Sequence, residues 1–248
     1  MRLLRLTAFT LLEYLRSGRV AVEIIALLSL YAIFFRRPMS SDYFFSVIGV
    51  FTPVLTLYTM ASVIGLGDRP ASYLLLARGV QRVSFLLGLF LAACAIMTGV
   101  YLLLSLLVLL LNLPPDLTLW QWMLGSLPIM LNIGLLASLM LMLSPLVFPS
   151  GWRLFVLGLI ALAFSSNFIG GQLLVTMPEA LRMLLRAFQA LLGGPLVPAF
   201  YGFQLAVTRD YGSITAIANL LAQTSLLISL LGLSLYAFTR RDLIFTNQ

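Results

Sequence analysis

The segment from Val83 to Leu111 has 29 consecutive residues without a charged side chain. An α-helix needs about 20 apolar residues to cross the hydrocarbon core of a bilayer. Of the 248 residues of the chain, 61% are hydrophobic and 9% are charged, whereas soluble domains have about 25% charged residues. The apolar runs are continuous and do not alternate, which argues against a β-barrel. The sequence therefore predicts an all-α polytopic membrane protein.

Six apolar runs separated by polar or proline-containing turns predict six transmembrane helices in a single transmembrane domain, 1–248. The predicted spans are 20–35, 44–64, 83–111, 123–148, 154–174 and 214–238. The first of them is short for a span. The fourth contains Pro128 and Pro145, and a proline inside a span predicts a kink.

The first 19 residues predict an interfacial elbow helix ahead of the first span. At 100° per residue, Arg2, Arg5, Glu13 and Arg16 fall in a sector of roughly 80°, and most of the remaining surface is apolar. This pattern is typical of a helix that lies in the membrane interface with its arginines toward the headgroups of membrane lipid. An irregular extension of the first span is the alternative.

The stretch 65–82 is the longest polar interruption in the first half of the chain. Asp68 is placed as an N-cap, Pro70 falls in the first turn and Gly79 stands where a helix would stop. We therefore expect a short helix over roughly 71–78, held at a membrane surface between the second and third spans.

A second amphipathic segment lies in 175–212, before the last span. Thr176 and Glu179 have the spacing of a capping box, and Glu179, Arg182 and Arg186 share one helical face. The apolar piece 198–207 that follows is too short to span a bilayer. We expect outer-leaflet helices here that dip into one leaflet or lie on it.

All 15 basic residues are arginines, and their placement predicts an orientation. With six spans, ten arginines lie on the side of the two termini and five on the other side. Because arginine is enriched in cytoplasmic loops, both termini are expected in the cytoplasm and the protein in the cell inner membrane. The arginines stand singly or in pairs beside apolar runs, so nucleic acid is not an expected partner.

The chain offers little catalytic chemistry. It has no histidine and one cysteine, Cys94, and no paired carboxylates, metal-ligand set or phosphate-binding loop is evident. We therefore expect no enzyme activity, metal or cofactor. Glu23 is the only carboxyl inside a predicted span. A pair with Arg19, four residues earlier, is the simplest interpretation, and contact with a substrate or proton is the alternative.

The layout resembles the permease subunit of ABC-2-type exporters. The resemblance rests on DRPASYLLLARGVQRVSFLLG between the second and third spans and on MPEALRMLLRAFQALLGGPLVP after the fifth. The chain departs from the family pattern at Gly79-Val80, where Pro-Val or Pro-Leu is frequent. It also lacks the acidic run that often precedes the short helix.

The resemblance implies that two permease chains, identical or paralogous, form a translocation path, driven by two copies of a cytoplasmic ATP-binding subunit. By position, the expected ATPase contacts are Asp68, Arg69, Tyr73, Arg78 and Arg82. Arg78 and Arg82 could instead anchor the third span at the headgroups. The apolar spans favour a lipid-linked, amphiphilic or hydrophobic cargo. A non-transporting membrane scaffold and a secondary carrier using Glu23 are the alternative functions.

Overall fold

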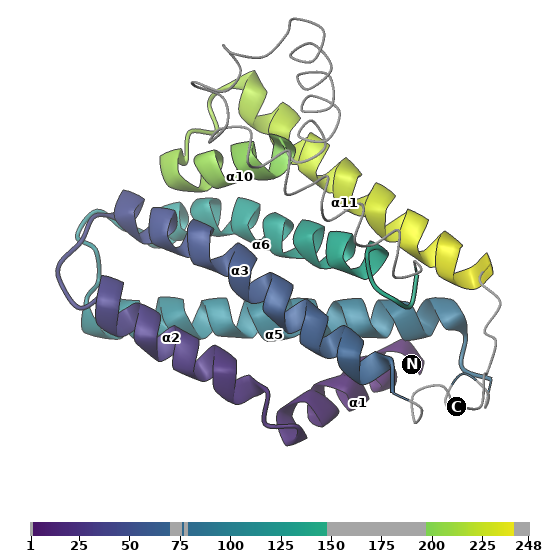
Figure 1. The fold of residues 1–248 in the computed structure, drawn as a ribbon. Helices are drawn as coiled ribbons and strands as arrows, with labels where there is room; N and C mark the ends of the chain where they lie inside the picture. The colour runs from purple at the N-terminus through teal and green to yellow at the C-terminus, as the bar shows by residue number, and fades with distance from the viewer. Residues whose placement is uncertain (1, 70–75, 77–78, 148–196, 241–248) are drawn as a thin grey trace, which may run out of the picture.

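The computed structural model (Figure 1) describes residues 2–69, 76, 79–147 and 197–240. These residues form seven α-helices, and none of the described residues is in a β-strand. Four of these helices are long and apolar enough to cross a membrane, and there are up to five crossings if two helices joined by a 72° bend count as one span. The predicted all-α class is confirmed, and the apolar helices indicate a membrane protein.

The chain begins with the bent pair and continues through the long helices. The helices are α1 (Arg2–Arg16), α2 (Val20–Phe34), α3 (Ser41–Gly67), α5 (Arg82–Leu111), α6 (Leu119–Met142), α10 (Val197–Thr208) and α11 (Ile214–Arg240). Helices α3, α5, α6 and α11 are the four candidate spans. Among the described elements, α6 packs against α3, α5, α10 and α11.

Three predicted spans agree with the structure within a few residues. They are 44–64, which lies in α3, 83–111, which lies in α5, and 214–238, which lies in α11. The apolar piece predicted at 198–207 is α10, a helix of 12 residues. Such a helix is about 18 Å long, against a hydrocarbon core of about 30 Å.

The fourth predicted span, 123–148, begins inside α6, but its inclusion of Pro145 is wrong because the helix ends before that residue. Helix α6 starts at Leu119 because the capping box of Thr118 and Gln121 satisfies its first backbone N–H groups. It ends at Met142. Pro145 has no N–H to donate and disfavours the helical conformation of Ser144, which opposes one more turn here, although Pro128 is accommodated inside the same helix.

The first predicted span, 20–35, corresponds to α2, which has only 15 residues. Such a helix is about 22 Å long and is too short to cross the bilayer alone. The fifth predicted span, 154–174, lies outside the described residues. So do the predicted amphipathic face of Glu179, Arg182 and Arg186 and most of the helix predicted at 71–78.

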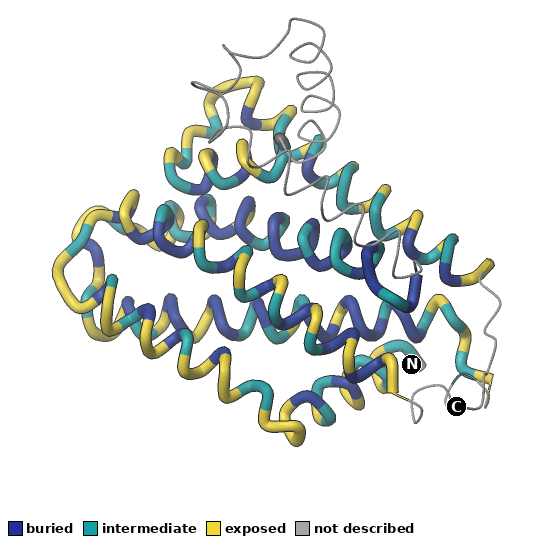
Figure 2. Tube along the Cα trace, viewed as in Figure 1, coloured by how far each residue is buried: buried dark blue, intermediate teal, exposed yellow. Residues whose placement is uncertain are grey.

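Helix α6 lies at the centre of the described bundle. Buried residues make up 61% of its most apolar stretch but only 11% of that of α11, and Figure 2 shows the same contrast along the two traces. Large apolar side chains face outward on the peripheral helices: Leu110 is 71% exposed and Ile214 is 85% exposed. In a membrane these side chains contact lipid, so their exposure has no hydrophobic cost.

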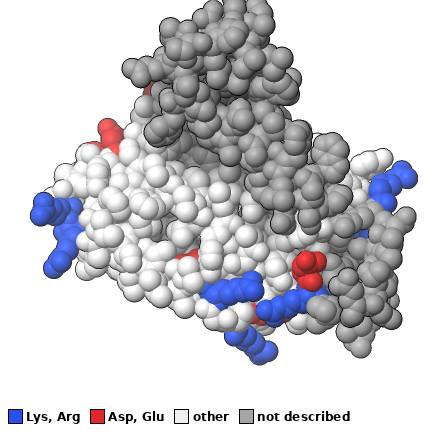
Figure 3. All heavy atoms as spheres, viewed as in Figure 1, with Lys and Arg blue, Asp and Glu red and all other residues white. Residues whose placement is uncertain are grey.

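The charged side chains lie mainly toward the two ends of the bundle, and the surface between them is largely uncharged on the face shown in Figure 3. One end carries the connection from α3 to α5 and the helix α1. The other carries the connections from α2 to α3 and from α5 to α6. This separation is what a membrane-spanning bundle requires, because charged groups are excluded from the hydrocarbon core.

Candidate functional site

Helix α1 packs against the first part of α5 and the last part of α3. The contact is close because Gly88 of α5 has no side chain: a Cβ atom there would lie 2.5 Å from Leu6 of α1. Thr10 and Tyr14 of α1 are buried on the same side. Small residues allow helix backbones to approach in this way, so α1 is a docked part of the bundle and not a loose extension.

The remaining surface of α1 divides into two faces. Leu4, Leu12 and Leu15 are 72%, 54% and 54% exposed and lie on one side of the helix. Arg5 and Arg16 are exposed on another side. Arg2 is the first residue of α1, and its side chain lies outside the described part. A helix with one docked, one apolar and one basic face can lie in the membrane interface while it is attached to the bundle.

The connection that follows α3 is linked to α1. Arg69 Nη1 lies 3.7 Å from Glu13 Oε1, and both side chains are partly exposed. Asp68 follows the last residue of α3, and its N–H donates to the Ile64 carbonyl at 2.9 Å. The start of the helix that Asp68 is predicted to cap lies outside the described residues. An ion pair with this exposure stabilises by about 0.2–1 kcal/mol, so it orients the segment more than it stabilises the fold.

The connection is also linked to α11 where α5 begins. Arg82 Nη1 donates a hydrogen bond to the Thr239 carbonyl at 3.1 Å, in the last turn of α11. The last carbonyls of a helix have no intrahelical partner and carry partial negative charge, so a guanidinium is favourable there. The segment between α3 and α5 is thus connected to α1 at one end and to α11 at the other.

Among the predicted ATPase contacts, Asp68, Arg69 and Arg82 therefore lie at one end of the bundle. Tyr73 and Arg78 are outside the described residues. The predicted stop at Gly79 agrees with its φ of +84°, and its N–H donates to the Leu76 carbonyl at 3.2 Å. A positive φ favours glycine, which has no Cβ.

Glu23 forms a buried polar cluster beside this end of the bundle. Its side chain is completely buried, and Oε1 accepts hydrogen bonds from the Tyr14 hydroxyl and, at 2.9 Å, from the Thr59 hydroxyl. Thr59 Oγ1 also lies 3.3 Å from Met97 Sδ. Glu23 Oε2 is buried without a hydrogen-bond partner. The cluster thus brings together side chains from α1, α2, α3 and α5.

The predicted pairing of Glu23 with Arg19 is not present. Arg19 Nη1 donates to the Ser62 carbonyl of α3 instead. The bend between α1 and α2 turns the backbone between them, with Gly18 at a φ of +73°. Spacing of four residues places two side chains together only within one continuous helix. Arg19 is the N-cap of α2 and has helical φ and ψ of −65° and −29°, so the spacing would allow the pair. The pair does not form because the Arg19 side chain extends to α3, whereas Glu23 accepts from Tyr14 and Thr59.

A second buried polar contact joins α6, α10 and α11. Gln223 Nε2 donates to Asn132 Oδ1 at 2.8 Å, and Asn132 Nδ2 donates to the Ala199 carbonyl at 3.0 Å. Gly202 of α10 faces Gln223 so closely that a Cβ atom would overlap the amide. Amide side chains often join helices within membranes, so this contact positions α10 against the spans.

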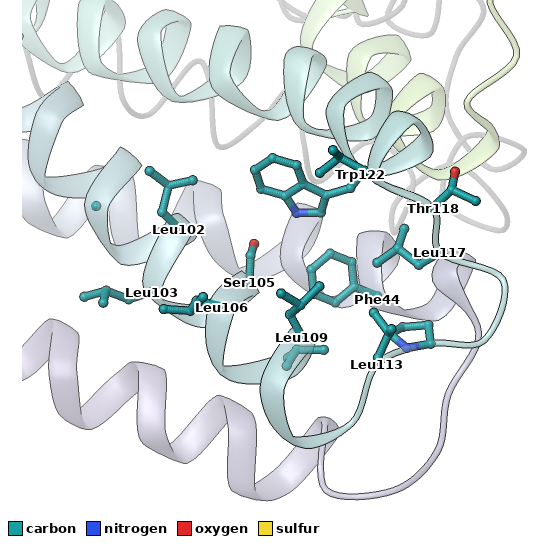
Figure 4. A pocket seen from close by; sticks show the side chains of 14 residues that line it. Phe44, Leu102, Leu103, Ser105, Leu106, Leu109, Leu113, Leu117, Thr118 and Trp122 are labelled. Carbon is teal, nitrogen blue, oxygen red and sulfur yellow. The ribbon is translucent and has the colours of Figure 1, made fainter.

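An apolar groove of about 750 Å³ lies between the second half of α5, the start of α6 and the loop joining them (Figure 4). Half of the residues that line it are leucines, Phe44 and Trp122 add aromatic rings, and the hydroxyl of Ser105 lies among the leucines. The α5 residues that line it extend from Gly99 to Leu109, about 15 Å of helix and so about half of the hydrocarbon thickness. A groove of this composition accommodates an alkyl chain or another apolar group.

The sequence indicates Glu23 as a candidate site residue but does not indicate the residues that surround it. Tyr14, Thr59 and Met97 are ordinary residues of apolar helices, and the only sequence signal for the cluster is a carboxyl that needs donors. Within the part of the chain that the structure describes, no group of three or more His, Cys, Asp or Glu side chains could hold a metal ion.

Comparison of the chain with protein-family models, with curated proteins and with solved structures gives no match.

Proposed function

We propose that this chain is the permease subunit of an ATP-driven exporter of the ABC-2 type. In this proposal it forms the translocation path with a second permease chain, and separate cytoplasmic ATP-binding subunits supply the energy. The chain itself is non-catalytic. Six spans are completed by α2, around which the bilayer thins because the helix has only 15 residues, and by the segment predicted at 154–174. Both termini are then in the cytoplasm.

The proposal rests on two side-chain contacts of the α3–α5 connection. Arg69 lies beside Glu13 of α1, and Arg82 donates to the Thr239 carbonyl of α11. A force applied to this segment by a partner would reach the first and last helices of the chain as well as α3 and α5. Such coupling through packed, hydrogen-bonded elements is what an externally driven transporter needs.

The three-sided surface of α1 supports its role as the interfacial elbow. Its docked side is fixed at Leu6 against Gly88, its leucines can enter one leaflet, and Arg5 and Arg16 can contact headgroups. The elbow would then move with α5 when a partner acts on the neighbouring connection.

The groove between α5 and α6 supports an amphiphilic or lipid-linked cargo. Its wall is almost entirely apolar, and in the proposed orientation it extends from the outer interface toward the membrane centre. An ionic solute would find no charged side chain in this wall. A cargo with an alkyl portion would exchange one apolar environment for another.

The test is purification of the tagged chain from native membranes in mild detergent, with the copurifying subunits identified by mass. We expect a stoichiometric ATPase. Arg69→Glu and Arg82→Gln should reduce its recovery or uncouple ATP hydrolysis from transport. Arg36→Glu is the matched control, because it changes an exposed arginine at the opposite end. ATPase recovery unaffected by Arg69→Glu and Arg82→Gln would exclude the docking residues. A chain purified without any ATPase would exclude the exporter and favour a scaffold.

The Glu23 cluster favours a second candidate, a secondary carrier that binds a cation or proton at this carboxyl. The specific observation is that Oε2 is buried without a partner. Polar groups buried in a membrane protein are frequently functional. Glu23→Gln keeps the size of the side chain and an acceptor oxygen but removes the ionisable group. Transport is measured in the absence of ATP. If the Glu23→Gln variant still transports, the carrier is excluded. If the variant folds normally but no longer transports, the carrier is supported.

A further inference from the structure

The connection between α2 and α3 borders a hollow of about 650 Å³ at the end of the bundle opposite α1. The guanidinium-bearing residues Arg36 and Arg37 line it together with Ser40 and Tyr43, whereas Ala32 and Ile33 of α2 form its apolar side. Basic side chains stand out at this end of the molecule in Figure 3. The lining of the hollow thus combines two guanidinium groups and two hydroxyl groups with apolar side chains of α2 and of the connection.

The connection that forms the hollow is held in place by the neighbouring loop. Asn112 Nδ2 donates to the Phe35 carbonyl at 2.9 Å. Asp116 accepts hydrogen bonds from the Ser41 N–H, at 3.0 Å, and from the Ser41 hydroxyl. These contacts lie just before and just after the two arginines in the chain. The hollow is therefore a preformed feature, and binding there would not need to order a free loop.

The acidic groups near the hollow are already engaged. Asp42 forms an ion pair with Arg209. Asp116 is held by Ser41, whose hydrogen bonds lower the pKa of the Asp116 carboxyl, so this group is a carboxylate at neutral pH. Asp210 accepts from the Gly212 N–H at 3.0 Å. Neither Arg36 nor Arg37 has a hydrogen bond or ion pair with another described residue. The guanidinium groups of Arg36 and Arg37 therefore adjoin the hollow without a direct contact to any of these carboxylates.

We propose that this hollow is a binding site for one anionic phospholipid. Arginine is suited to phosphate because its planar group presents paired N–H donors to two oxygens. The apolar side continues along α2, where Ile25 and Leu28 are 63% and 53% exposed. A phospholipid whose phosphate contacts the arginines can place its acyl chains along this helix. Free phosphate would use only the cationic side, so the amphipathic form of the hollow selects a lipid.

The test measures lipid bound to the purified, delipidated chain by native mass spectrometry. The probes are phosphatidylglycerol and phosphatidylcholine with the same acyl chains, and glycerol phosphate is the competitor. We expect one phosphatidylglycerol to bind in preference to phosphatidylcholine, and glycerol phosphate not to displace it. The R36Q/R37Q variant should bind phosphatidylglycerol roughly thirtyfold more weakly, the combined effect of two basic residues at an anionic lipid surface.

The matched control is R69Q/R240Q, which removes two exposed arginines at the opposite end of the bundle and should keep the preferential binding. If R36Q/R37Q does not fold, R36K/R37K retains the charge but not the paired donors, and it should show an intermediate loss. Equal phosphatidylglycerol binding by the wild type and R36Q/R37Q, or by the wild type and R36K/R37K, would overturn the proposal. Displacement by glycerol phosphate would also overturn it, because the ligand would then be a soluble phosphate. The proposal does not depend on the chain being an exporter.

Discussion

Glu23 and Asp116 are two carboxyl groups held by hydroxyl donors at opposite ends of the bundle. Glu23 accepts from Tyr14 and Thr59 and is completely buried. Asp116 accepts from the N–H and the hydroxyl of Ser41 and is exposed. The hydrogen bonds are similar, but water can replace those of Asp116 and cannot reach those of Glu23. The same kind of hydrogen bond therefore contributes more to stability when it is buried than when it is exposed to water.

The largest expected effect is that of Glu23→Ala. It leaves the Tyr14 hydroxyl buried without its acceptor and the Thr59 hydroxyl with only the weak acceptor Met97 Sδ. A buried hydroxyl without an acceptor costs about 1–3 kcal/mol. We expect the free energy of unfolding to fall by about 2–4 kcal/mol, measured by denaturation in detergent. Glu13→Ala is the control, since Glu13 is partly exposed and its contact with Arg69 is 3.7 Å long. Equal losses in the two variants would contradict the importance of burial.

A smaller effect is expected for Tyr14→Phe. It removes one donor to Glu23 Oε1 and leaves the ring, so the expected loss is about 1 kcal/mol. Combined with Glu23→Ala, it should cost much less than the sum of the single changes, because the interaction is already absent. Denaturation of the four proteins of this cycle gives the coupling. Strict additivity would show that the contact contributes nothing.

Asp116→Asn is expected to lower stability by less than about 1 kcal/mol, the usual range for exposed charged groups. The amide cannot accept from Ser41 with both of its polar atoms as the carboxylate does. The loss should be visible in the same denaturation measurement at neutral pH. An effect as large as that of Glu23→Ala would refute the comparison between the two sites.

The smallest expected effect is the pH dependence of the Asp116 contribution. The pKa of this carboxyl is lowered in the folded protein by its hydrogen bonds with Ser41. Because the pKa is lower in the folded than in the unfolded protein, the ionised carboxyl stabilises the fold at pH values above its unfolded pKa of about 3.9. This contribution is lost as the pH falls through the folded pKa. The difference between wild type and Asp116→Asn should therefore shrink when the pH is lowered below about 4. A difference that grows on acidification would show that the sign is wrong.

The long helices were predictable because their signal is local and repeated. The run from Val83 to Leu111 corresponds to α5 within one residue, since no helix-breaking residue interrupts it. The sequence predicts Pro145 inside a span because the run of apolar residues continues past it, although the helix ends before it. The capping box at Thr118 falls outside the apolar run, so the apolar pattern alone does not show that α6 begins four residues before the predicted span.

The candidate sites were less predictable than the helices. Glu23 stood out in the sequence as a carboxyl in an apolar run, but the expected partner was Arg19. The partners found, Tyr14 and Thr59, lie 9 and 36 residues away. Nothing local connects them. They meet because α1 folds back at Gly18 and docks on Gly88 of α5, a contact between helices that no periodic pattern specifies.

The sequence alone predicts the class of this protein, the positions of its long apolar helices and the placement of most charged residues in the segments between those helices. These properties follow from composition and from the length of each run, because a bilayer selects helices by those quantities alone. The tertiary structure decided which side chains meet: the cluster around Glu23, the links of Arg69 and Arg82, and the hollow beside Arg36 and Arg37. Such contacts depend on how the helices pack, and packing is set by shape and close approach across the whole bundle.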